Sequence, residues 1–247
     1  FGAHMFSGGM MVGGPHLFFG RNFPNCASVT VEGDDFPKKI IIDYGEGCVG
    51  IAGLEKRGTI TIEMTDTITN AGATYTITFE DVTIGNRQVE KSATISNEGM
   101  DADGNWIISM HTVTSSTVSN EGETLIVTRD FSEVKTWLTG FDTPESKDDI
   151  FLKSGGGSIT VDEELRFERQ ITDPLLIDRT CMFPLSGIIE ITRGGEFMII
   201  DFGAGECDNI AVVTKDGQDE EIELVSGRFR KGFKREHKHM KQNKGWW

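Results

Sequence analysis

Apolar and polar residues alternate along several stretches of this chain. Apolar side chains recur at every second position from Arg57 to Thr65 and over 75–79, and over 165–171 the alternation resumes at Leu165, Phe167 and Ile171. A period of two places these side chains on one face of an extended strand, whereas a helix would need a period near 3.6. The pattern therefore predicts half-buried antiparallel strands and gives no sign of long amphipathic helices.

Turn signals separate these runs. They are Gly85-Asn86, Asp103-Gly104, Glu121-Gly122, Gly155-Gly156-Gly157 and Asp216-Gly217. Dipeptides of this kind between β-branched or aromatic runs are typical of hairpins. We therefore expect an all-β fold of roughly twelve to fourteen strands in a long antiparallel meander, arranged as a β-sandwich or a strongly twisted open barrel.

The domain organisation follows from composition. Phe1 to Met5 resemble a protease-site and cloning-site remnant, and residues 1–22 together are expected to be this remnant and a flexible Gly-rich tether. Residues 23–227 form the predicted all-β domain, which a polar, Pro-containing stretch at 143–149 divides into two halves or interrupts as a surface loop. Residues 228–247 form a basic C-terminal tail.

Four cysteines define an internal repeat. Cys26 and Cys48 bracket one β-turn-β segment, and Cys181 and Cys207 bracket another. The segment midpoints, Pro37 and Gly194, fall in predicted turns, so an antiparallel hairpin would bring each cysteine pair together at its open end. We favour the pairs Cys26 with Cys48 and Cys181 with Cys207; cross-pairing between the segments is the alternative. Zinc is disfavoured because the cysteines lack close Cys-x2-4-Cys spacing. Disulfides would indicate an oxidising compartment.

The net charge of −15 is unevenly distributed. The last 20 residues carry eight Lys or Arg and one Glu, a charge of +7, which leaves −22 on residues 1–227. An acidic body repels nucleic-acid phosphates, so we expect no nucleic-acid partner. No apolar run approaches the roughly 18 to 20 residues that cross a bilayer. We expect the tail to be solvated or docked on the acidic body, although its closing Trp246-Trp247 pair leaves an interfacial role open.

A turn of the form Asp-aromatic-Gly-x-Gly ends both repeats. It reads Asp43-Tyr44-Gly45-Glu46-Gly47 in the first and Asp201-Phe202-Gly203-Ala204-Gly205 in the second. Asp43, Asp201 and Asp208 are weak candidates for calcium ligands, because calcium prefers carboxylates and exposed carbonyls. The favoured interpretation is structural: the glycines adopt positive φ at a strand end and the aromatic ring packs inward.

Other chemistry is sparse in the sequence. There is no Gly-x-Ser-x-Gly elbow, Walker loop or His-Glu-x-x-His motif, so we expect no catalytic residue, no cofactor and no enzymatic activity. Trp106 and Trp137 could stack on sugars but are expected in the core. His111 is expected as a surface or packing residue, and His237 with His239 as part of the tail.

Four segments carry a family resemblance. They are Asp43 to Cys48, Arg57 to Ile62, Thr136 to Gly140, and Asp201 to Asn209. With these segments the chain, over Cys26 to Leu224, resembles a group of uncharacterised Bacteroidetes secreted proteins or lipoproteins. The resemblance implies export and lipid anchoring of the precursor at a cysteine upstream of this chain. It implies no activity.

These observations favour a non-enzymatic cell-envelope protein, at the outer membrane and cell surface or in the periplasm, which binds a protein or glycan or contributes to a surface assembly. Membrane attachment is expected only through the upstream lipid anchor. A carrier of an apolar ligand such as a lipid, and a carbohydrate-binding or carbohydrate-active module, remain as alternatives. A carrier requires an apolar cavity, a sugar site requires exposed aromatic rings beside carboxylates, and an assembly subunit requires an unpaired sheet edge.

Overall fold

The computed structural model describes residues 26–50, 53–120, 123–143 and 145–225. Fourteen strands and no helix occur in these ranges. The strands are β1 Ser28–Glu32, β2 Lys38–Asp43, β3 Cys48–Val49, β4 Glu55–Met64, β5 Thr74–Ile84, β6 Arg87–Met100, β7 Trp106–Asn120, β8 Glu123–Thr139, β9 Ile150–Val161, β10 Glu164–Asp178, β11 Ser186–Arg193, β12 Glu196–Ala204, β13 Ile210–Lys215 and β14 Gln218–Glu223.

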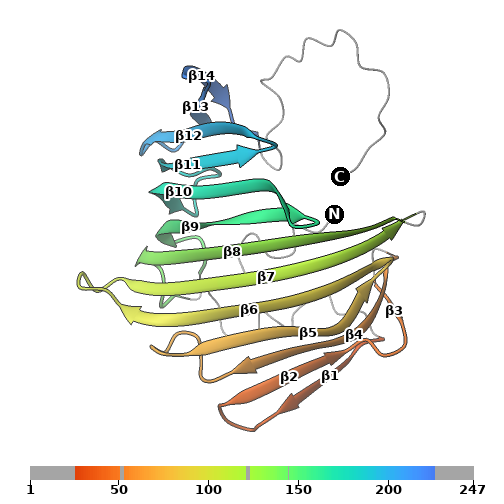
Figure 1. The fold of residues 1–247 in the computed structure, drawn as a ribbon. Helices are drawn as coiled ribbons and strands as arrows, with labels where there is room; N and C mark the ends of the chain where they lie inside the picture. The colour runs from red at the N-terminus through yellow and green to blue at the C-terminus, as the bar shows by residue number, and fades with distance from the viewer. Residues whose placement is uncertain (1–25, 51–52, 121–122, 144, 226–247) are drawn as a thin grey trace.

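All fourteen strands belong to one antiparallel sheet. The strands follow one another in chain order from β1 to β14, except that β3 pairs only with β4 (Figure 1). The sheet does not close, and β1 and β14 lie at its opposite ends. The prediction of an all-β antiparallel meander is therefore confirmed. The strands form one open sheet and not a sandwich of two sheets.

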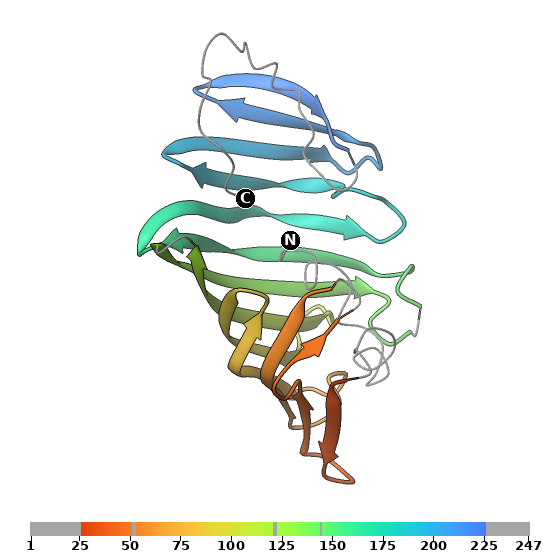
Figure 2. The same cartoon turned by 90° about the vertical axis from the view of Figure 1, so that its right-hand side faces the viewer.

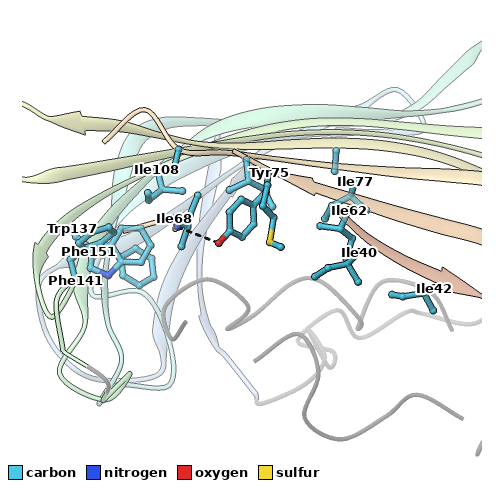
Figure 3. Packing of buried hydrophobic residues seen from close by; sticks show 14 of the residues in the cluster. Ile40, Ile42, Ile62, Ile68, Tyr75, Ile77, Ile108, Trp137, Phe141 and Phe151 are labelled. Carbon is cyan, nitrogen blue, oxygen red and sulfur yellow. Dashed lines mark hydrogen bonds between the residues drawn. The ribbon is translucent and has the colours of Figure 1, made fainter. Parts of the chain in front are cut away.

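The larger core lies on one face of the strands from β2 to β9. Ile40, Ile62 and Ile77 are directly opposite one another across β2, β4 and β5, and all three are buried. Their side chains project from the same face of the sheet (Figure 3). Within this cluster the Tyr75 hydroxyl accepts a hydrogen bond from the Ile68 amide at 3.2 Å. The period of two in the sequence thus corresponds to this buried face.

A second, smaller core lies on β10, β12 and β13 and includes the residue directly after β14. Its buried residues are Ile171, Leu175, Ile200, Phe202, Ala211, Val213 and Leu224. Figure 2 shows β9 to β14 stacked in one layer, whereas the strands from β1 to β5 turn away from that layer. The stretch 143–149 belongs to the loop between β8 and β9, and those two strands pair from Val127 opposite Val161 to Thr139 opposite Ile150. The hydrogen-bonded sheet is therefore continuous across this loop.

The prediction of a chain reversal at Gly155-Gly156-Gly157 was wrong. These glycines lie inside β9, hydrogen-bonded to β8 on one side and β10 on the other. A Cβ atom at Gly155 would lie 2.2 Å from the Ser132 carbonyl oxygen, and one at Gly157 would lie 2.3 Å from that of Asp130. The glycines therefore allow close backbone approach within a strand, which is the other common use of glycine in sheets.

Both predicted disulfides are present. Cys26 is bonded to Cys48 with a Cα–Cα separation of 5.4 Å, and Cys181 to Cys207 with 5.7 Å. The midpoints of the two segments lie in the turns that join β1 to β2 and β11 to β12. Disulfides persist in oxidising environments, so this pairing indicates an exported protein.

Several sequence predictions fall outside the described residues. They concern the remnant and tether at 1–22, the turn at Glu121-Gly122, and the basic tail at 228–247 with its two histidines and two tryptophans. The remaining predicted turns, at 85–86, 103–104 and 216–217, all connect consecutive strands. In the described ranges there is no helix long and apolar enough to cross a membrane.

Candidate functional site

The first edge of the sheet exposes apolar side chains. In the described part of the chain, β1 has a neighbouring strand on one side only. Val29 and Val31 are directly opposite Ile42 and Ile40, so they lie on the buried face of the sheet. The two isoleucines are 3% exposed, but Val29 is 41% exposed and Val31 54%. The valines thus continue the core face to a position where no further strand covers them.

The backbone of β1 is equally suited to receive a strand. Its register with β2 runs without a bulge, and Ser28 to Glu32 contain no proline or lysine and one charge. Proteins commonly protect an edge with lysine, proline, a bulge or very short length, because unpaired amide and carbonyl groups are a template for another strand. Of these devices, β1 has only its short length of five residues.

The opposite edge differs in charge. β14 has the sequence Gln218-Asp219-Glu220-Glu221-Ile222-Glu223, in which four of the six side chains are acidic. A strand that approaches this edge would meet a row of negative charges. Charged edges are a common means of preventing edge-to-edge pairing. The sheet therefore has one guarded edge and one apolar, unguarded edge.

The repeated motif has the predicted strand-ending role in its first copy, whereas its second copy lies largely within β12. Asp43 accepts a hydrogen bond from the Gly45 amide at 2.7 Å, and Asp201 accepts one from the Gly203 amide at 2.8 Å. Tyr44 and Phe202, which follow the aspartates, are both buried. Burial also raises the pKa of the Tyr44 hydroxyl. β2 ends at Asp43, whereas β12 continues through Asp201 to Ala204 and shifts its register with β11 there. Both motifs return an aromatic ring to the core.

The three calcium candidates each accept a local hydrogen bond from the backbone. Asp208 accepts a hydrogen bond from the Ile210 amide at 2.9 Å, in the same manner as Asp43 and Asp201. Among the described residues, no three His, Cys, Asp or Glu side chains lie close enough together to hold a metal ion. The structure thus brings no set of ligands together around any of the three.

The aromatic candidates belong to the core, as predicted. Trp137 is buried and contacts Phe141 and Phe151, with ring centroids 5.6 and 5.1 Å away. Trp106 is half-buried and stacks on Phe141 with centroids 4.9 Å apart. The Trp137, Phe141 and Phe151 rings lie together at one end of the larger core (Figure 3).

A shallow polar depression lies over β8, β9 and β10. It is lined by Asp130, Ser132, Gly156, Gly157, Ser158, Glu168 and Gln170. The His111 ring beside it is exposed, as predicted, and its Nε2 lies 2.8 Å from Asp130 Oδ1. The lining offers hydroxyl, amide and carboxylate groups to solvent, and it contains no aromatic side chain from the described residues.

No protein-family model, curated protein or solved structure matches this chain. The features that bear on function are therefore those of the molecule itself. Sequence reasoning missed two of them, the unguarded edge at β1 and a group of charges on β8 to β10 described below. Both depend on which strands are neighbours, and strand order does not follow from a periodic pattern.

Proposed function

We propose that this protein is a non-enzymatic cell-envelope protein that binds an extended segment of a partner along the edge of β1. It acts at the cell surface or in the periplasm, attached through a lipid anchor upstream of this chain. The partner is another envelope protein or a second copy. The two disulfides support an exported location, since such bonds persist in oxidising compartments.

The observation that carries the proposal is the exposure of Val29 and Val31 in register with buried isoleucines. An added strand would cover both valines and pair the backbone groups of β1 that have no partner strand among the described residues. In this mode of recognition main-chain hydrogen bonds give affinity, and alternate side chains give specificity. A partner segment with apolar residues at every second position would fit the edge.

Self-assembly through the same edge is also compatible with the sequence of β1. In an antiparallel pair of β1 strands centred on Thr30, Val29 would face Val31 of the second copy, and Ser28 would face Glu32. No like charges would oppose one another. Two β14 strands would instead place acidic side chains against acidic side chains, which is unfavourable across strands. No observation in the described residues favours the apolar-ligand carrier or the carbohydrate module over strand binding.

The test is site-specific photo-crosslinking in cells that express the full-length precursor. A photoreactive phenylalanine analogue replaces Val31 in one strain and Glu221 of β14 in a matched control. We expect a discrete crosslinked product from position 31 and none from position 221. Adding Val29→Lys to the first strain should abolish the product, because a lysine at an edge opposes strand addition. Equal products from both positions, or insensitivity to Val29→Lys, would refute strand binding at β1.

A further inference from the structure

A single carboxylate on the central strands, that of Glu133, pairs with two cations, and a third cation, Lys135, lies two positions along the same strand. Glu133 of β8 lies 2.8 Å from Lys153 Nζ of β9 and 2.5 Å from Arg169 Nη2 of β10, measured from Oε1. The side chains of Glu133, Lys153 and Arg169 are only 13%, 22% and 28% exposed, respectively. Burial raises the pKa of Glu133, but the two cations outweigh it and lower that pKa below its usual value. Glu133 is therefore a carboxylate shared by two partners.

The third cation, Lys135, has no such partner. It lies directly opposite Lys153 across β8 and β9, where like charges destabilise a sheet. Its ammonium group lies 5.2 and 5.6 Å from the ring centroids of Phe151 and Trp137. No ion pair within 4 Å joins it to a carboxylate of the described residues. Burial, followed by the charge of Lys153, lowers the pKa of Lys135.

The charges near Lys135 do not balance within the protein. Asp149 and Arg179 also act on Lys135, with opposite effects on its pKa. Asp149 can offset at most the single charge of Arg179. Glu133 neutralises one of the remaining three cations, so an excess of at least two positive charges is left on a protein whose net charge is −15.

Arg169 also carries a hydrogen-bond donor that has no acceptor. Its Nε atom is buried and has no hydrogen-bond partner. The guanidinium is held in place by Glu133 and by the Phe131 ring, whose centroid lies 5.1 Å from Cζ. A buried donor without a partner costs about 1–3 kcal/mol, so a position of this kind calls for an acceptor.

We propose that Lys135, Lys153 and Arg169 bind an oxyanion of the phosphate or sulfate class, free or carried on a larger molecule. A divalent oxyanion would neutralise the excess of two charges. Its several oxygens would accept from both ammonium groups and from the guanidinium, a geometry that suits arginine. The site lies in the middle of the sheet, six or more strands from β1 in the order of the sheet, so it is independent of the proposed strand binding.

The first test is isothermal titration of the whole chain with inorganic phosphate in a chloride buffer. We expect saturable binding, and Lys135→Met should weaken it about tenfold or more, the effect of losing one charged hydrogen bond. Lys91→Met is the matched control, because Lys91 of β6 also lies over an aromatic ring, with its Nζ 5.7 Å from the Phe79 centroid. The control should leave phosphate affinity unchanged.

A second variant tests the direction of the effect. Glu133→Gln releases Lys153 and Arg169 from their shared carboxylate, so phosphate should bind this variant more tightly than the original chain. Glucose 6-phosphate and a short-chain phosphatidic acid, titrated in parallel, distinguish a free anion from a sugar phosphate or a lipid headgroup. The proposal is overturned if none of the three ligands binds saturably, if Lys135→Met and Lys91→Met weaken binding equally, or if Glu133→Gln fails to strengthen it.

Discussion

Asp149 is a buried carboxyl group at the end of the loop between β8 and β9. The residue is 4% exposed, and its Oδ1 atom is buried without a hydrogen-bond partner. Burial raises the pKa of this carboxyl group, and the positive charge of Arg179 opposes the shift only in part. The native state therefore favours the protonated form of Asp149 more than the unfolded chain does.

The substitution Asp149→Asn removes this charge while it preserves the shape of the side chain. Burying an ionised carboxylate costs more than burying a neutral amide, so we expect the variant to unfold with a free energy greater by about 1 kcal/mol or more at pH 7.5. For a domain of this size that corresponds to a melting temperature higher by roughly 2–4 °C.

The pH dependence follows from the direction of the pKa shift. The favourable contribution of protonated Asp149 is complete below the pKa of the unfolded chain and is lost as pH rises through the raised folded pKa. The advantage of Asp149→Asn should therefore shrink as pH falls from 7.5 to 4. Urea unfolding at several pH values, followed by tryptophan fluorescence, measures both effects.

Asp142→Asn is the matched control, because Asp142 lies in the same loop and is exposed. We expect this change to alter stability by less than about 0.5 kcal/mol. If Asp149→Asn destabilises the protein at pH 7.5 to an extent that does not vary with pH, then Asp149 is an ionised partner of Arg179 and the reasoning fails.

Three further predictions concern the first disulfide, a glycine inside β9 and an exposed valine of β1. Replacing Cys26 and Cys48 together by serine should lower the free energy of unfolding by about 3 kcal/mol in urea titrations, because the disulfide closes a 22-residue separation; no change would mean that the hairpin does not depend on it. Gly157→Ala should lower the melting temperature by several degrees, since the new Cβ atom would lie 2.3 Å from the Asp130 carbonyl oxygen. Gly50→Ala is the control and should be nearly neutral, because the nearest atom to its Cβ would be 3.7 Å away. Val31→Lys should change the stability of the isolated protein by less than about 0.5 kcal/mol, because this side chain is 54% exposed; a larger loss would show that the edge is already filled.

The elements that the sequence predicted best are those with a strong local signal. Ile62 and Tyr75 lie in period-two runs and are buried. The cysteine pairing followed from two segments with turns at their midpoints, since a hairpin necessarily brings its ends together. Asp43 and Asp201 precede glycines in the same way, and each accepts a hydrogen bond from the glycine amide two residues further on.

The features that the sequence could not predict depend on neighbours distant along the chain. The pairing of Glu133 with Arg169 joins residues 36 positions apart, and the opposition of Lys135 and Lys153 exists only because β8 pairs with β9. Three consecutive glycines indicate a turn when they are considered alone. Their place inside β9 is determined by the two strands that approach them from either side.

The measurement that tests the account most directly is the redox state of the four cysteines in the protein isolated from its native cells. Cells are quenched with an alkylating reagent, and the protein is digested without reduction and mapped by mass spectrometry. We expect two disulfide-linked peptides, one joining Cys26 to Cys48 and the other Cys181 to Cys207, in the exported fraction. Four alkylated thiols, in protein recovered from the cytoplasm, would contradict both the disulfide-linked hairpins and the proposed role in the cell envelope.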